Sequence, residues 1–367
     1  MTDKASRSRW RSITLALTGG MLAVATIAPA VAQAGELVPK FWLYIGDECV
    51  STYGDRSGAP ELIWRDSSGA LKAHVTLAAD DSLYCSGDPS IVVEIGDRLK
   101  LKQGADSYTL IVPQLSIQLR RANDRVAGTA PPNTLLRVEC DRSDPFRHFE
   151  PCVYRKKFFS NADGTWATGV PFDFIGDAEM AVRWRNAAGD EVRAWATAPF
   201  IQVTLDRSIF RGATRSGGTA QVSIGVADGT AMGDPFDGEF TGQFRDNASN
   251  PVNVEPGMVL TSNVSPDANF IVPAIDASAS VATDEVSGRC YDTGSSAQLV
   301  NVLLTRSGVQ RGWALEYTEP DGSFAFNFLT DEDDFFWTNA NIRHGDRLTF
   351  RCMQQEGDWV QKILLLP

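Results

Sequence analysis

Beyond residue 35, hydrophobic and polar positions alternate along many short segments of the chain. In 348–352, Leu348, Phe350 and Cys352 alternate with Thr349 and Arg351, and segments 71–77, 180–185 and 324–328 follow the same rule. Alternation with a period of two is typical of strands that have one buried and one solvated face. Short strands separated by Gly, Pro, Asp and Asn turns predict an all-β protein made of antiparallel two-sheet sandwiches.

A sequence pattern recurs along the chain at intervals of about 80 residues. A hydrophobic residue and a glycine open each unit, an Asp-Gly pair before an aromatic residue follows, and a Gly-Asp-like turn comes last. The opening glycines are Gly128, Gly212 and Gly288. The Asp-Gly pairs begin at Asp163, Asp237 and Asp321, and the later turns lie at Gly176-Asp177, Gly257-Met258 and Gly345-Asp346. A unit of this length suits a complete small domain.

The same interval predicts an earlier unit, for which two registers are open. Gly46 or Gly54 opens it, Asp80-Asp81 takes the place of Asp-Gly, and Gly96-Asp97-Arg98 matches Gly345-Asp346-Arg347. The predicted organisation is a leader followed by four sandwiches, with bounds 1–34, 35–122, 123–205, 206–283 and 284–367. Short joins without Gly/Ser-rich stretches predict that the units do not swing freely.

The N-terminal segment 1–34 is typical of a cleaved signal peptide. Basic residues from Lys4 to Arg11 precede a largely apolar stretch, and Ala32-Gln33-Ala34 offers a small-x-small cleavage site. The alternative is an uncleaved membrane anchor. Beyond the leader, the sequence shows no segment long and apolar enough for a transmembrane helix. We therefore expect a secreted, extracellular or cell-envelope protein with no membrane span after cleavage.

The chain carries a formal net charge of −12, with 46 acidic and 34 basic residues. Because phosphate contacts dominate nucleic-acid affinity, an acidic chain without long basic clusters is not expected to bind nucleic acid. The single dense basic run after the leader, Arg155-Lys156-Lys157, is better explained as a solvated strand end.

Six cysteines fall in pairs within three of the four predicted units. They are Cys49 and Cys85, Cys140 and Cys152, and Cys290 and Cys352. An exported chain meets an oxidising compartment, so disulfides within each unit are the simplest prediction. The absence of CxxC and Cys/His clusters argues against a structural metal at these residues.

Candidate chemistry beyond the cysteines is sparse. Asp331, Asp333 and Asp334 form a carboxylate run suited to Ca²⁺, with a solvated charged loop as the alternative, and we expect no other cofactor. The three histidines, His74, His148 and His344, lack an accompanying catalytic motif and are expected to be structural or exposed. If the protein has a sugar-binding aromatic platform, Trp64 and Trp337 are the first candidates.

The repeated unit resembles the tandem β-sandwich modules of bacterial surface and secreted proteins, in the immunoglobulin-like and carboxypeptidase-regulatory-like groups. The segment Val126–Pro132, together with Asp163-Gly164 and Gly176-Asp177, carries the resemblance. It implies an immunoglobulin-like fold and a role in spacing, adhesion or accessory binding, and it implies no catalytic residue.

We therefore expect an exported, non-enzymatic protein that acts as a spacer or adhesion-type interaction module at or outside the cell surface. Its partner would be an extracellular protein or a glycan. Two alternatives stay open from the sequence, a carbohydrate-binding accessory protein and a hydrolase with facing carboxylates in a cleft between units.

Overall fold

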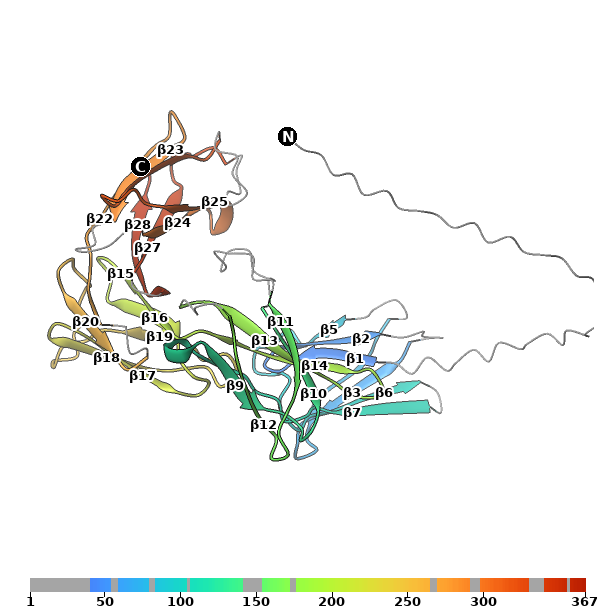
Figure 1. The fold of residues 1–367 in the computed structure, drawn as a ribbon. Helices are drawn as coiled ribbons and strands as arrows, with labels where there is room; N and C mark the ends of the chain where they lie inside the picture. Colours follow the sequence, from blue (N-terminus) through green and yellow to red (C-terminus); the bar gives the residue numbers. More distant parts are fainter. Residues whose placement is uncertain are drawn as a thin grey trace, which may run out of the picture. The chain divides into compact units, whose positions relative to one another are not determined.

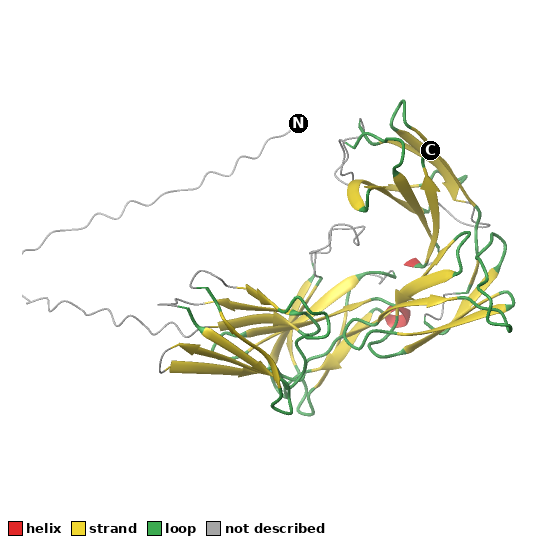
Figure 2. Ribbon diagram, turned by 180° about the vertical axis from the view of Figure 1, so that it is seen from behind, coloured by secondary structure: helices red, strands yellow, loops and turns green. Residues whose placement is uncertain are grey.

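A computed structural model describes residues 40–53, 59–78, 83–103, 106–140, 154–171, 176–264, 269–290, 298–329, 340–354 and 357–367. Strands dominate these residues, and helix is limited to short 3-10 turns such as η1 (Arg121–Asn123), as Figures 1 and 2 show. No helix in the described part is long and apolar enough to cross a bilayer. The predicted leader and cleavage site lie outside the described residues.

The strands form two successive copies of one arrangement. The first copy comprises β1 (Lys40–Tyr44), β2 (Cys49–Tyr53), β3 (Glu61–Arg65), β4 (Leu71–Thr76), β5 (Leu83–Cys85), β6 (Arg98–Gln103), β7 (Asp106–Ile111), β8 (Gln118–Arg120), β9 (Arg125–Thr129), β10 (Leu135–Glu139), β11 (Arg155–Phe159), β12 (Thr165–Gly169), β13 (Glu179–Arg185) and β14 (Glu191–Thr197). The second comprises β15 (Phe200–Thr204), β16 (Ile209–Ala213), β17 (Thr219–Ile224), β18 (Ala227–Met232), β19 (Glu239–Gln243), β20 (Val259–Ser262), β21 (Phe270–Ile271), β22 (Ile275–Ser280), β23 (Glu285–Cys290), β24 (Leu299–Arg306), β25 (Val309–Tyr317), β26 (Ser323–Asn327), β27 (Arg347–Met353) and β28 (Trp359–Leu365).

Each copy contains one seven-stranded sheet, one four-stranded sheet and one three-stranded sheet. The seven-stranded orders are β11-β10-β13-β14-β1-β2-β5 and β19-β16-β15-β28-β27-β24-β25. In the first copy, one hydrophobic core joins all three sheets through residues such as Phe41, Trp64 and Val126. In the second, residues such as Phe210, Leu260 and Val286 do the same. Each copy is therefore a pair of sandwiches fused through a shared sheet.

The fusion of two sandwiches depends on a parallel strand pair that the sequence does not reveal. β1 pairs in parallel with β14, and β15 pairs in parallel with β28, so the first strand of each copy hydrogen-bonds to its last strand. The other pairs between named strands are antiparallel, as predicted. The predicted bounds of the four single sandwiches stay predictions, because the shared sheets group these units two by two.

The recurring glycine and aromatic residue are direct cross-strand partners. Gly128 lies opposite Trp166, Gly212 opposite Phe240, and Gly288 opposite Phe324. A Cβ added at Gly212 would lie 2.9 Å from the Phe240 ring and 2.0 Å from the Phe200 carbonyl oxygen. Only glycine leaves room for the ring and for the backbone that approaches behind it.

The first sandwich departs from this pattern. Gly46, one of the two predicted opening glycines, lies in the turn between β1 and β2 with φ +89°, so that register is wrong. The pairing of β1 with β2 and of β15 with β16 places Thr52 at the position of Gly212. Gly54, the other candidate, lies outside the described residues. In this first sandwich, the neighbouring strands β2 and β5 are joined by the disulfide Cys49–Cys85.

The Gly-Asp turn is confirmed in detail in the first and last sandwiches. The Gly96 N–H donates to the Val112 oxygen and the Gly345 N–H to the Leu366 oxygen, both at 2.9 Å, with φ near +85° at both glycines. The buried Asp346 carboxylate accepts two bonds of 2.7 Å from Arg306. Burial acts to raise the pKa of Asp346, but the Arg306 bonds, the bond from the Arg343 N–H and the charges of both arginines together lower it. In the second sandwich the turn is shifted by one residue, because Asp177 adopts the positive φ there. The predicted Gly176-Asp177 register is therefore wrong.

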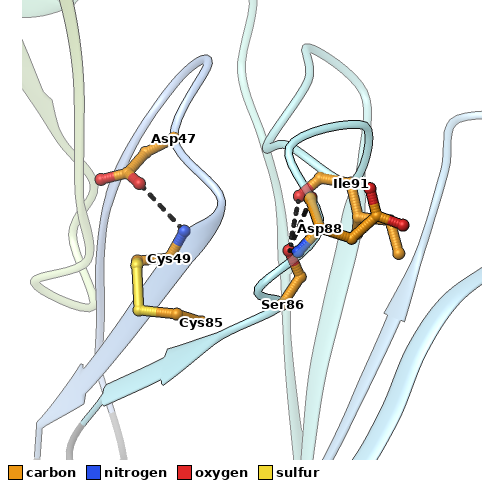
Figure 3. Close-up of a disulfide and its surroundings, with 6 residues drawn as sticks. All are labelled: Asp47, Cys49, Cys85, Ser86, Asp88 and Ile91. Atoms are coloured by element: carbon orange, nitrogen blue, oxygen red, sulfur yellow. Dashed lines mark hydrogen bonds between the residues drawn. A yellow bond between two sulfur atoms is a disulfide. The ribbon is translucent and has the colours of Figure 1, made fainter.

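Two of the three predicted disulfides are present among the described residues. Cys49–Cys85 joins the neighbouring strands β2 and β5. Figure 3 also shows Asp47 and Ser86, whose side chains form hydrogen bonds in the turns next to this disulfide. Cys290–Cys352 crosses the core from β23 to β27. Cys140 is disulfide-bonded as well, whereas Cys152, its expected partner, lies outside the described residues.

The Gly–aromatic pair generates a stability prediction. A Cβ in Gly128→Ala would lie 1.9 Å from the Ser116 carbonyl oxygen, so the strands must move apart, and we expect a loss of about 2–3 kcal/mol in unfolding free energy. Gly169→Ala, in the partner strand β12, is the matched control, because its nearest atom would be 4.0 Å away. Urea denaturation measures both variants. Equal losses would contradict the proposed role of the glycine.

Candidate functional site

The outer faces of the two seven-stranded sheets, which point away from the hydrophobic core, carry many polar and charged side chains. Alternation along β1 directs Phe41 and Leu43 into the core and Trp42 and Tyr44 to the opposite face. Along β15, Ile201 and Val203 point into the core and Gln202 and Thr204 point away. We name these surfaces the first and the second outer face.

A network of arginines and two buried glutamates occupies the first outer face. Glu139 pairs with Arg183, and with Arg137 at 2.9 Å. Glu191 pairs with Arg185 at 2.9 Å and with Arg193 at 2.7 Å. Since both carboxylates are bound by guanidinium groups, they form a structural ion-pair network rather than the acid–base pair that a hydrolase needs.

The aromatic residues of this face are covered by one of these arginines. The Arg193 guanidinium lies 4.6 Å from the Trp42 ring centroid and 5.2 Å from that of Tyr44. It also donates to the Tyr44 hydroxyl at 2.6 Å. Stacking of a cation on both rings stabilises the face and reduces the aromatic surface that it offers to a ligand.

Identical strand registers allow a position-by-position comparison of the two outer faces. Arg183 and Arg351 occupy equivalent positions, so both outer faces carry an arginine there. At the other positions the second outer face replaces charged residues by amide and apolar ones: Arg137 by Asn301, Glu139 by Leu303, Arg155 by Trp313, Glu191 by Trp359, and Arg193 by Gln361. The ion-pair network of the first outer face has therefore no counterpart at these positions.

The second outer face contains a hollow of about 560 Å³, a volume within the range of small-molecule sites. Its lining includes Glu239 from edge strand β19, Arg211 from β16, Arg351 from β27, Asn301 from β24, and Gln310 and Trp313 from edge strand β25. Residues from both edges of one sheet line the same hollow, so the sheet curls around it. Strong twist and coiling of a large sheet produce such a concave face.

The hollow contains amide atoms that lack hydrogen-bond partners among the described residues. Asn301 is 2% exposed, and its Oδ1 is unpaired there. Gln310 Nε2, on the adjacent strand, is likewise buried and unpaired. A buried polar atom without a partner costs about 1–3 kcal/mol, so such atoms are rare and call for an explanation.

Two buried glutamines hold the arginines of the second outer face in place. Gln202 Nε2 donates to Gln361 Oε1 at 2.7 Å. Arg211 donates to Gln202 Oε1 at 2.9 Å, and Arg351 donates to Gln361 Oε1 at 3.2 Å. These amides hydrogen-bond to the guanidinium groups, as the carboxylates do on the first outer face, although they lie at other positions of the sheet: Gln361 takes the place of Arg193.

The candidate residues taken from the sequence lie elsewhere. Trp64 is fully buried and donates to Asp97 Oδ2 at 2.7 Å, so its assignment to a sugar platform is wrong. His74 is exposed beside Glu61, and His344 is exposed near the C-terminal residue. Asp331, Asp333, Asp334, His148 and Trp337 lie outside the described residues. Among the residues that the structure does describe, no three metal-ligating side chains cluster.

Sequence reasoning missed the hollow because its residues come from strands far apart in the chain. Asn301 and Trp313 each lie on an alternating strand, where a polar or aromatic residue on the outer side is unremarkable by itself. The usable signal is the comparison of equivalent positions in the two copies, and that comparison requires the strand registers.

No protein-family model and no curated protein matches the chain. Solved structures similar to it include a tetra-tandem repeat from the extending region of a large adhesion protein, with 15% identity over 89% of this chain and 98% of that one, and a TM-score of 0.19. A bacterial ice-binding adhesin is 15% identical over 65% and 88%, with a TM-score of 0.17. The BSP domain of a biofilm-associated protein is 9% identical over 90% and 96%, with a TM-score of 0.17.

With TM-scores below 0.5, we draw no functional conclusion from these similarities. The class of the protein follows from its own strands: it is an all-β protein of tandem sandwiches built mainly from antiparallel strands.

The ion-pair network generates a prediction that separates buried from exposed pairs. Arg183 contacts both buried glutamates and its side chain is 19% exposed, so we expect Arg183→Leu to cost about 2–4 kcal/mol. Arg185→Leu is the control, because its 65% exposed side chain pairs with Glu191 and with no other acidic residue in the described part of the chain, and we expect less than about 1 kcal/mol. Guanidinium denaturation measures both. A larger loss for Arg185→Leu would rule out the network as a stabilising element.

Proposed function

We propose that the protein is an exported, non-enzymatic spacer and interaction module that carries tension between its ends in the extracellular space or cell envelope. The observation that carries this proposal is the parallel pairing of the first and last strands of each copy. Disulfides and the leader-like segment support export. The interaction partner that we propose is an extracellular protein or a glycan.

The parallel pair is loaded in shear when the chain is pulled. Trp42, Leu43 and Tyr44 of β1 lie beside Glu191, Val192 and Arg193 of β14 in the same direction. The chain enters at the N-terminal end of β1 and leaves at the C-terminal end of β14, which are opposite ends of the pair. Tension therefore acts along the strands and across their hydrogen bonds, which must break together.

A buried aspartate reinforces this pair at the same place in both copies. The Phe41 N–H donates to Asp190 Oδ1 at 2.8 Å, and the Ile201 N–H donates to Asp358 Oδ1 at 2.7 Å. Both aspartates are fully buried. In the first copy the Tyr108 hydroxyl also donates to Asp190, and burial together with this bond raises the pKa of Tyr108 to about 12.

The join between the copies suits transmission of force. β14 ends at Thr197 and β15 begins at Phe200, so only Ala198 and Pro199 lie between the last strand of one copy and the first strand of the next. Proline limits the freedom of this join, and a flexible Gly/Ser tether is absent there. Tension leaving β14 therefore passes directly into β15.

Single-molecule force spectroscopy on residues 35–367, held by the two ends, tests the proposal. We expect two high-force events, each releasing about 300–450 Å of chain, because each copy of roughly 160 residues opens only when its parallel pair breaks and the disulfides keep the residues that they enclose from extending. Asp190→Ala should lower the force of one event and Asp358→Ala that of the other, so each variant is the control for the other. Release of four shorter segments at low force would refute a load-bearing role.

A further inference from the structure

We infer that the hollow of the second outer face is a binding site for a neutral saccharide. This inference goes beyond a spacer role, since it gives the module a specific ligand. It depends on side chains of the second copy and not on the parallel strand pair.

The unpaired amide atoms define the chemistry that a ligand must supply. Asn301 Oδ1 needs a donor, and Gln310 Nε2 needs an acceptor. A hydroxyl group serves both needs, because it donates one hydrogen bond and accepts others. A ligand rich in hydroxyl groups therefore satisfies atoms that the described residues of the protein leave unpaired.

The hollow also offers the apolar contact that a sugar ring requires. Trp313 and Leu303, which are cross-strand partners on β25 and β24, both line it. The face of an aromatic ring is electron-rich and attracts the weakly positive C–H groups of a sugar.

The charges around the hollow favour a neutral ligand over an anionic one. Asp234, Asp237 and Glu239 line it together with Arg211 and Arg351. In one site, carboxylates accept hydrogen bonds from the hydroxyl groups of a neutral sugar, and guanidinium groups donate hydrogen bonds to them. A polyanionic glycan would meet these three carboxylates together with Asp177, which also lines the hollow, and be repelled.

The first outer face provides the internal comparison. There the equivalents of Asn301 and Trp313 are Arg137 and Arg155, which pair with Glu139. Duplication has therefore left one outer face closed by ion pairs and the other with an unpaired amide and an indole. We assign saccharide binding to the second face and none to the first.

Isothermal titration of residues 35–367 tests the inference. The neutral panel is maltohexaose, cellohexaose, laminarihexaose, xylohexaose and chitohexaose; polygalacturonate and an extended hexapeptide of neutral residues represent the other ligand classes. We expect at least one neutral oligosaccharide to bind and to change the tryptophan fluorescence, and neither polygalacturonate nor the peptide to bind more tightly. Failure of all five neutral sugars, or preference for the acidic polymer or the peptide, would overturn the inference.

Asn301→Leu separates a binding role from a structural one. This variant should lower the affinity for the oligosaccharide by about tenfold or more, because the ligand loses its hydrogen bond to Oδ1. The melting temperature of the free protein should stay equal or rise, because the variant removes a buried acceptor that has no partner there. Arg137→Leu, the same change at the equivalent position of the first copy, should leave saccharide affinity unchanged.

Two further results test whether these side chains bind the saccharide. Trp313→Phe keeps a ring in the hollow and should weaken binding less than Asn301→Leu does, with the fluorescence change lost or reduced. If Asn301→Leu binds as the parent does, the amide atoms are satisfied by ordered water only and the inference is wrong. Because the two-event force pattern does not depend on Asn301, failure here leaves the load-bearing proposal to be judged on its own measurement.

Discussion

The hydrogen bonds between the first and last strands of each copy join the sheets of its two sandwiches into one, over a hydrophobic core that the sandwiches share. Leu43 lies beside Val192 and Val203 beside Val360, and each partner is about 150 residues away in the chain. Such pairing carries a high entropic cost of closure, because the long intervening chain must be ordered first. The buried aspartates Asp190 and Asp358, each bound to a backbone N–H of the first strand, help to offset this cost.

The single sandwich could be predicted from the sequence, because its signals come from residues that are close together in the chain. Period-two alternation and the recurring turns predicted an all-β fold of antiparallel sandwiches, which the structure confirms. The recurring glycine and aromatic residue were visible as a spacing, and the structure supplies the reason: they are cross-strand partners in contact. Cysteine pairing within units was also predictable for Cys49–Cys85 and Cys290–Cys352, because each pair lies within one sandwich.

The features that the sequence did not reveal are those that depend on distant strands. Nothing local in the segment Lys40–Tyr44 says that it joins Glu191–Thr197, so the shared sheet was not predicted. Of the two registers left open for the first unit, Gly46 is wrong, because Thr52 takes the place of the marker glycine. The disulfide Cys49–Cys85 joins the two strands of this unit. Trp64 was misjudged because its indole bonds to Asp97, and alternation alone does not reveal a buried partner in the turn before β6.

The two copies show how one backbone supports different surfaces. Equivalent outward positions carry an arginine–glutamate network in one copy and amide and indole groups in the other, while the inward positions keep a continuous core. Outward positions are free to diverge because core packing does not constrain them. In the function that we propose, the backbone pairing supplies strength and the outer faces supply specificity.

The most direct test of this account is the unfolding of isolated fragments. Residues 35–198 and 199–367, expressed separately and followed by calorimetry, should each unfold in a single cooperative transition, whereas residues 35–122 and 123–198 alone should not, because each lacks strands of the shared sheet. Cooperative unfolding of residues 35–122 and 123–198 as independent domains, with stabilities that together match the intact copy, would contradict the claim that the fused pair is the folding unit.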